Sequence, residues 1–173
     1  ASKDGVKTQL ISSHPLGEKL TGTLRSQSFA LPEKLSFYIC GHDGFPTNKL
    51  QMKNFVRLRD TDTGAILYQV SPPRNDTARQ ITWDLKKFKG KRGYIEAVDA
   101  DIERAYAWIA FGRFEPALPQ LVTVDPNQTA NFQKAAAELA QSLKLKELQP
   151  QLTALLREPG TDFAARAACA SAV

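Results

Sequence analysis

The sequence predicts a mainly β protein with an α-helical tail, in which a jelly-roll β-sandwich is followed by a helical hairpin. Two observations predict the sandwich. Short apolar stretches rich in β-branched and aromatic residues are separated by turn clusters, and no helical period lies between them. A third observation predicts the tail, because the hydrophobic period becomes helical after Pro116–Pro119. About eight strands of this length are typical of a jelly roll.

The strand predictions depend on where the chain turns. Asp60–Gly64 offers side chains that bond their own backbone, and Lys89–Gly93 offers two glycines. Pro72 and Pro73 exclude a central strand at their position. Between such breaks we expect strands at Thr8–Ser13, Thr23–Leu31, Leu35–Cys40, Asn54–Asp60, Ala65–Val70, Arg79–Leu85, Arg92–Asp99 and Ala105–Phe114.

The division into domains follows the change of period. We expect the sandwich over residues 1–118, a linker over 119–128 and a helical segment over 129–173. Glu158–Gly160 should end the second helix, and Thr161 or Asp162 should cap the third. The residues expected on the buried face of the first helix are Phe132, Ala136, Leu139, Ala140 and Leu143.

The end of the chain resembles one HEAT repeat. The stretch LQPQLTALLREPGTDFAARAACASAV has a leucine-rich helix, a Pro-Gly turn and an alanine-rich helix with an early arginine. Repeats of this kind stack on one another. We therefore expect the chain to be a piece cut from a longer protein, with a truncated helical array; the alternative is that the protein naturally stops there.

Composition bounds the function. The net charge of +5 is not concentrated in a basic arm, so nucleic acid is not expected as a partner. No apolar run reaches the roughly 20 residues that span a bilayer, and membrane insertion is not expected. Two cysteines are too few for a disulfide scaffold.

Loop order predicts where polar residues gather. Strands joined by short links run antiparallel, so successive loops lie at alternate ends of the sandwich. The end reached by Cys40 collects both histidines and most short carboxylates and amides, and a rigid scaffold that presents such groups is suited to binding. These residues are His14, Glu18, His42, Asp43, Asn48, Asn54, Arg74, Asn75, Asp76, Asp99 and Asp101.

The first hundred or so residues resemble a known module. The runs LTGTLRSQSFALPEKLSFYICGHDGFP, NFVRLRD, PPRND, WDL and GYIEAVDADIERAYAWIAFGRF resemble, in order, a galactose-binding-like β-sandwich of planctomycete and verrucomicrobial multidomain envelope proteins. In those cytochrome c/dehydrogenase proteins the module is fused to helical repeats and c-type cytochrome domains. The resemblance implies carbohydrate binding, a periplasmic or cell-envelope location and neighbouring domains of the same polypeptide as partners.

No haem is expected in this chain. Covalent attachment needs Cys-x-x-Cys-His, and that motif does not occur in the sequence. Any oxidoreductase activity would belong to the parent protein.

Several readings of the individual motifs stay open. His42 and Asp43 in GHDG could bind sugar hydroxyls, hold a metal together with His14, or only shape a turn between Gly41 and Gly44. In PPRND, Arg74 could donate to a ligand while Asn75 and Asp76 accept, or the stretch could be a rigid turn in which Arg74 pairs with Asp43 or Asp101.

The stretch VDADIERAYAW has two readings. Asp99 and Asp101 suggest a structural calcium ion, although the EF-hand pattern is absent. Tyr106 could form a platform for a sugar ring, whereas Trp83 and Trp108, which lie in predicted strands, are more typical of the core.

Catalysis is not expected. Paired carboxylates for a glycosidase, or a Cys40 thiolate beside His42, are conceivable, but the sequence has no nucleophile elbow. The prediction is a noncatalytic carbohydrate-binding module, and the alternative is a spacer or protein-interaction module that positions neighbouring domains. The predicted ligand-binding residues are His42, Asp43, Arg74, Asn75, Asp76, Asp101 and Tyr106.

Overall fold

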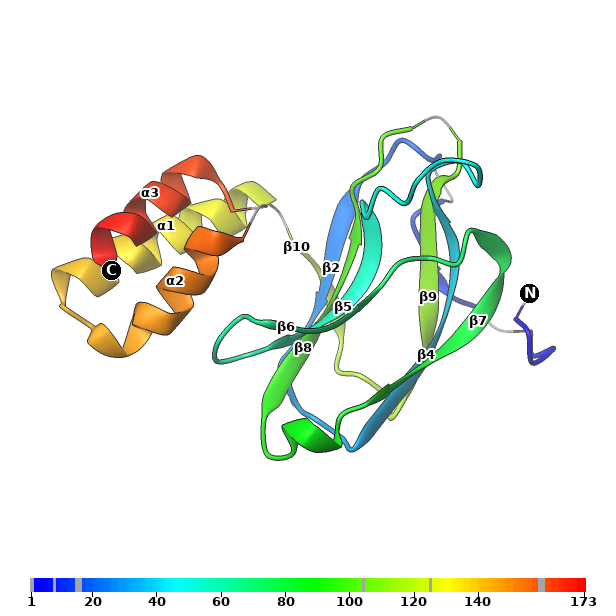
Figure 1. Cartoon of the computed structure of the whole chain (residues 1–173), viewed down its shortest axis with the longest axis horizontal. Coiled ribbons are helices and arrows are strands. Elements are labelled where there is room, and N and C mark those ends of the chain that lie inside the picture. Colours follow the sequence, from blue (N-terminus) through cyan, green and yellow to red (C-terminus); the bar gives the residue numbers. More distant parts are fainter. Residues whose placement is uncertain (1, 8, 15–16, 104, 125, 159–160) are drawn as a thin grey trace.

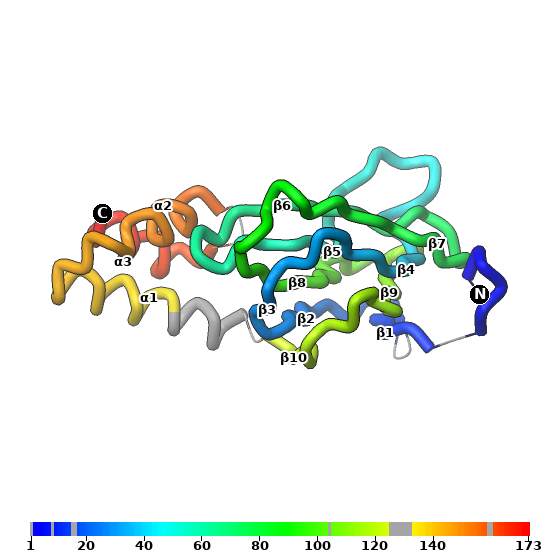
Figure 2. The backbone as a smooth tube through the Cα atoms, turned by 90° about the horizontal axis from the view of Figure 1, so that it is seen from below, coloured from blue at the N-terminus to red at the C-terminus, as the bar shows by residue number. Residues whose placement is uncertain are grey.

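Two antiparallel sheets and a C-terminal group of helices make up the protein (Figure 1). The computed structural model describes residues 2–7, 9–14, 17–103, 105–124, 126–158 and 161–173, with the backbone alone for 126–132. The helices lie at one end of the long axis and the N-terminus lies at the other (Figures 1 and 2). The predicted class, mainly β with a helical tail, is therefore confirmed.

The strands divide between the sheets as follows. The first sheet has the order β1 (Ile11–Ser12), β9 (Ala107–Glu115), β4 (Lys34–Asp43) and β7 (Asn75–Asp84). The second has the order β10 (Leu121–Val124), β2 (Gly22–Ser26), β8 (Arg92–Asp99), β5 (Asn54–Asp60) and β6 (Ile66–Val70), and β3 (Phe29–Ala30) pairs with β8.

Most of the predicted strands are present, and the differences lie at their ends. β5 and β8 have the predicted bounds, whereas β4 continues to Asp43 and β7 already begins at Asn75. The two-residue strand β1 covers little of the first prediction, and Thr8 lies outside the described residues.

The sheet also extends beyond the predicted boundary of the sandwich. β10 lies within residues 119–128, which were expected to be a linker, and it pairs antiparallel with β2. Its alternation of apolar residues and one threonine, LVTV, is short, and proline precedes it closely. Pairing with the edge of β2 supplies the hydrogen bonds that so short a run cannot make alone.

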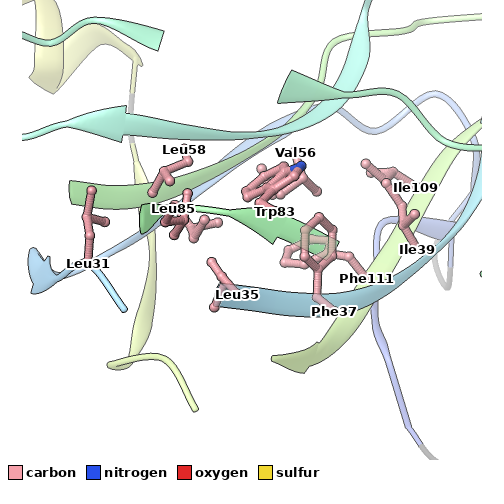
Figure 3. Close-up of a cluster of buried hydrophobic side chains, with 12 residues drawn as sticks. Leu31, Leu35, Phe37, Ile39, Val56, Leu58, Trp83, Leu85, Ile109 and Phe111 are labelled. Atoms are coloured by element: carbon pink, nitrogen blue, oxygen red, sulfur yellow. The ribbon is translucent and has the colours of Figure 1, made fainter. Parts of the chain in front are cut away.

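The core lies between the two sheets (Figure 3). Alternate residues of each strand face inward, as the period of two requires. Trp83 is buried against Phe37 with ring centroids 4.9 Å apart, so the prediction that Trp83 is a core residue is confirmed. The buried set is Leu31, Leu35, Phe37, Ile39, Val56, Leu58, Trp83, Leu85, Ile95, Ala97, Ile109 and Phe111.

Three α-helices follow the sandwich within the described residues. They are α1 (Pro126–Ser142), α2 (Gln149–Arg157) and α3 (Phe163–Ala172), with the short 3₁₀ helix η3 (Lys146–Leu148) before α2 (Figure 2). The predicted cap is confirmed, because the Asp162 carboxylate accepts hydrogen bonds from the backbone N–H groups of Ala164 and Ala165 at 2.8 and 3.3 Å. Pro159 and Gly160 lie outside the described residues.

The buried face of α1 differs from the predicted one. Ala137 and Ala140 are buried, whereas Leu139 and Leu143 are more than half exposed. The side chain of Phe132 lies outside what is described. The buried alanines pack in one cluster with Leu152 of α2 and Cys169 of α3. Small residues allow helices to approach closely, and here they decide which face of α1 is covered.

An ion-pair network joins the helices to the second sheet. Glu158, which follows α2, pairs with Arg57 and Arg59 of β5, and both arginines pair with Glu96 of β8. Burial opposes the charge of Glu96, but the neighbouring arginines outweigh it and lower its pKa. Glu158 therefore links the end of α2 to the outward-facing arginines of β5. Within the described residues, no helix is long and apolar enough to cross a membrane.

Candidate functional site

The GHDG motif belongs to the last part of β4. His42 pairs with Trp108 of β9 and Asp43 pairs with Ala107, so the strand is continuous through both residues. Consecutive residues of a strand point to opposite faces of the sheet. Ile39 belongs to the core between the sheets, and Asp43 therefore faces inward while His42 faces outward. The motif thus contributes to two different environments.

Gly41 makes this strand end possible. Its φ of +113° is disfavoured for residues with a side chain, and a Cβ atom there would lie 2.3 Å from the backbone oxygen of Trp108. The β4–β7 register also shifts between Ile39 and Gly41. The interpretation that Gly41 shapes the end of the strand therefore has a direct structural reason.

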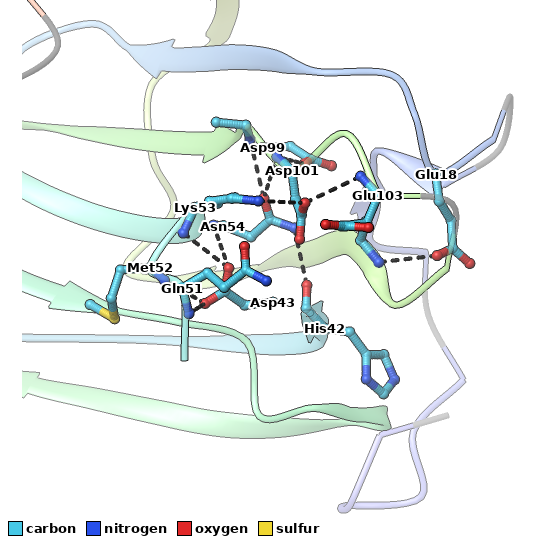
Figure 4. Close-up of polar contacts among 12 residues, drawn as sticks. Glu18, His42, Asp43, Gln51, Met52, Lys53, Asn54, Asp99, Asp101 and Glu103 are labelled. Atoms are coloured by element: carbon cyan, nitrogen blue, oxygen red, sulfur yellow. Dashed lines mark hydrogen bonds and ion pairs between the residues drawn. The ribbon is translucent and has the colours of Figure 1, made fainter. Parts of the chain in front are cut away.

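The Asp43 carboxylate organises the loop that follows it (Figure 4). It is fully buried, and its Oδ2 accepts from the N–H groups of Gln51 and Met52 at 3.0 and 2.6 Å. Its Oδ1 accepts from the N–H groups of Lys53 and Asn54 at 2.9 and 3.2 Å. Four donors occupy both oxygens, so Asp43 holds the 44–53 loop and has no face open to a ligand.

Arg74 holds the same loop from the other side. Its guanidinium donates to the backbone oxygens of Asp43 (2.9 Å), Pro46 (3.2 Å), Asn48 (2.5 Å) and Lys49 (3.0 Å). Its own φ is +57°, which places the side chain over the loop. The predicted pairing of Arg74 with the carboxylates of Asp43 or Asp101 is replaced by these carbonyl contacts.

Asn75 and Asp101 also make internal contacts. Asn75 Oδ1 accepts from the Thr77 N–H at 2.7 Å, which is the turn predicted for PPRND. Asp101 is fully buried, and its Oδ1 accepts from Lys53 Nζ at 3.2 Å and from the Glu103 N–H at 3.2 Å. Together with Asp43 and Arg74, these contacts confirm that loops distant in sequence meet at one end of the sandwich.

A pocket of about 610 Å³ opens on the outer face of the first sheet at the same end. Each of the four strands contributes a lining residue: Ser12 from β1, Trp108 from β9, His42 from β4 and Asp76 from β7. Its size is that of a small-molecule site. The residues that line it are Ser12, His14, Glu18, His42, Asp76, Ala105, Tyr106 and Trp108.

Two histidine–carboxylate pairs provide the polar groups of this pocket. His42 Nε2 lies 3.0 Å from Asp76 Oδ1, and the Asp76 side chain is 83% exposed although the histidine is buried. His14 Nε2 lies 3.6 Å from Glu18 Oε1, and Glu18 Oε2 accepts from the Ala107 N–H at 3.0 Å. Each carboxylate is thus anchored while retaining exposed surface.

Aromatic rings provide the apolar walls. The Tyr106 ring packs edge-on against His42 and tilted against Phe45, with centroids 4.9 Å apart in both cases. Trp108 lies 5.5 Å from the His14 ring and 5.9 Å from the His42 ring. Tyr106 is 39% exposed. Partly exposed rings beside fixed acceptors form a surface that can contact the apolar face and the polar edge of a ring-shaped molecule.

The pocket contains some predicted residues and omits others. His42, Asp76 and Tyr106 line it, whereas Asp43, Arg74, Asn75 and Asp101 do not. His14, Glu18 and Trp108 were not among the residues predicted to bind ligand. The antiparallel pairing of β4 with β9 brings Trp108 beside His42, and the alternation of the two strands is the signal that could have found it.

Two other interpretations of these groups concern a metal ion and a reactive thiol. Within the described residues, no set of three or more His, Cys, Asp or Glu side chains is placed to hold a metal ion. Lys53 occupies one oxygen of Asp101, and the calcium ion at Asp99 and Asp101 stays a prediction. Cys40 is buried on the outer face of β4, and burial raises the pKa of its thiol, as expected for a small apolar residue.

No protein-family model matches the sequence, and no curated protein matches it.

Proposed function

We propose that the protein is a noncatalytic carbohydrate-recognition module and that the pocket around His42, Asp76 and Tyr106 binds the sugar. The observation that carries the proposal is the combination, in one open pocket of about 610 Å³, of aromatic rings with two anchored carboxylates. Sugar rings have apolar C–H faces and hydroxyl edges. Aromatic faces and fixed acceptors match these two features.

The roles within the pocket follow from exposure and bonding. Asp76 offers an exposed carboxylate that His42 holds in place, and it is suited to accept from two neighbouring hydroxyls. Glu18 is fixed through the Ala107 N–H and keeps its other oxygen near His14. Tyr106 supplies a partly exposed ring for stacking. The proposed setting is a periplasmic or cell-envelope protein in which this module positions other domains.

A glycan array, run with and without a chelator, tests the proposal. We expect a limited set of glycans to be retained, and we expect Asp76→Ala and Tyr106→Ala each to reduce retention at least about tenfold, which corresponds to the loss of a hydrogen bond or a stacked ring. The matched control is Glu33→Ala, an exposed acid elsewhere on the sandwich. Loss of retention with the chelator alone would assign a role to calcium.

A spacer that positions neighbouring domains is the second candidate function. It is favoured by the buried arginine–glutamate network through which Glu158 fixes the helices to β5. A rigid joint of this kind is what a spacer requires. The same array separates the two functions, because a spacer retains none of the glycans and the substitutions at Asp76 and Tyr106 then have no effect.

A further inference from the structure

A second pocket lies between the two sheets, away from the one described above except at Ser12. Its volume is about 200 Å³, and its surface is mostly apolar. It opens at the side of the sandwich, where Ile11 and Leu20 are 44% and 49% exposed. The lining residues that matter here are Leu20, Gly22, Leu24, Ala97, Asp99 and Ile109.

The register of β2 and β8 explains why the pocket exists. Leu24 pairs with Ala97 and Gly22 pairs with Asp99, so all four positions share the inward face of the sheet. Ala97 and Leu24 contact the core, but Gly22 has no side chain, and a Cβ atom there would have nothing within 4 Å. The glycine therefore leaves open space on the inward side of β2, at the position paired with Asp99.

Asp99 is the one acidic side chain that lines this pocket. It is 5% exposed, and its Oδ1 accepts from the Asp101 N–H at 3.3 Å. Its Oδ2 is buried and has no hydrogen-bond partner. Burial raises the pKa of Asp99, and the nearby Ser13 hydroxyl and the Asp101 N–H oppose that rise without cancelling it. An unpaired buried carboxyl oxygen is costly, and a ligand that donates to it would remove that cost.

We propose that this pocket binds a small molecule with an apolar body of about the size of one six-membered ring and a single hydrogen-bond donor that reaches the Asp99 carboxyl group. The size follows from the volume, since an apolar cavity of about 150 Å³ holds benzene. The apolar body contacts Leu24, Ala97 and Ile109, and the donor meets the carboxyl group. Neither contact involves the histidine-lined pocket, so this inference is independent of the proposed function.

The test measures binding of benzyl alcohol, benzylamine and toluene by the methyl resonances of Ala97, Leu24 and Ile109. We expect saturable shifts with both donor-bearing probes and a dissociation constant roughly tenfold weaker for toluene, which lacks the donor. In Asp99→Ala, the preference for the donor-bearing probes should disappear while toluene still binds. Equal binding of the three probes to the unaltered protein would overturn the role of Asp99.

Blocking variants test the location. Gly22→Leu should abolish the methyl shifts because its side chain fills the pocket, and Leu20→Trp should reduce them by closing the opening without changing the strand interior. Thr82→Leu, an exposed position on β7, is the matched control and should leave binding unchanged. A thermal melt of each variant verifies that it is folded. Absence of shifts with every probe, or full binding by both folded blocking variants, would overturn the proposal.

Discussion

His42 and Asp43 are neighbours in the chain, yet they belong to regions with different physical character. Asp43 faces the interior, where four backbone N–H groups occupy its carboxylate. His42 faces outward, where its partner Asp76 is 83% exposed. Both regions lie at the same end of the sandwich and contain the same residue types. What separates them is how many of their hydrogen-bonding positions the protein itself has already used.

This difference distinguishes residues that build the loop from residues that can meet a ligand. A carboxylate with both oxygens saturated and no exposed surface cannot bind a ligand without breaking its own contacts. An exposed carboxylate that is held by one partner keeps acceptor positions open and is fixed in place. The Asp43 and Arg74 contacts therefore support the 44–53 loop, and that loop carries Phe45, which packs on Tyr106 in the pocket.

The largest effect should come from Asp43→Ala. It leaves four buried or partly buried N–H groups without an acceptor, and we expect the free energy of unfolding to fall by about 3 kcal/mol or more. Urea unfolding monitored by tryptophan fluorescence measures this change. Asp62→Ala, at an exposed turn, is the matched control and should change stability by less than about 0.5 kcal/mol. A decrease in the free energy of unfolding below about 1 kcal/mol for Asp43→Ala would show that the 44–53 loop is stable without the Asp43 carboxylate.

Much of the fold could be predicted because local patterns determine it. β5 and β8 have their predicted bounds, since alternating apolar residues and clear turn clusters define both ends. β10 was missed because four residues carry little periodic signal and their partner, β2, is about 100 residues earlier in the chain. The buried face of α1 was assigned to leucines, whereas small alanines pack against α2 and α3, a choice that depends on tertiary neighbours.

The candidate site could be predicted only in part. Loop order correctly brought Asp43, Arg74 and Asp101 to one end, because antiparallel pairing alternates the loops. It could not show which side chains face outward, since that depends on where β4 ends. Extending β4 by three residues beyond Cys40 places His42 and Asp43 on opposite faces. Trp108 was assigned to the core because the sequence does not show which side chains of its strand face outward; it lines the pocket beside His42.

An intermediate and pH-dependent effect is expected from Asp99→Asn. The folded-state pKa of Asp99 is raised above 3.8 chiefly by burial; the charge of Asp101 adds to the rise, whereas hydrogen bonds from Ser13, the Asp101 N–H and Asn54 oppose it. For an acid with a raised pKa, the stability present below pH 3.8 is lost as the pH rises through the folded-state value. The variant lacks this loss, so its stability relative to the unaltered protein should increase from pH 4 toward neutral pH.

Urea unfolding at a series of pH values measures this effect. Asp62→Asn, at an exposed turn, serves as the control for the loss of a surface carboxylate. A difference for Asp99→Asn that is independent of pH would mean that Asp99 ionises as easily in the folded protein as in the unfolded chain. Asp99 would then have a hydrogen-bond donor at Oδ2, and it would belong with Asp43 among the saturated carboxylates.

The smallest effect on stability should come from Asp76→Ala. The contrast with Asp43→Ala is the sharpest test of the difference between the outward-facing and the inward-facing region. The Asp76 side chain is 83% exposed and its one contact here is with His42, so the pair contributes little against solvent. We expect the free energy of unfolding to change by less than about 0.5 kcal/mol, in the same urea assay used for Asp43→Ala. A loss above about 1 kcal/mol would mean that Asp76 supports the fold through His42. A negligible loss of stability combined with loss of glycan retention means that the carboxylate acts in binding and not in folding, either by contacting the ligand or by holding the His42 ring against it.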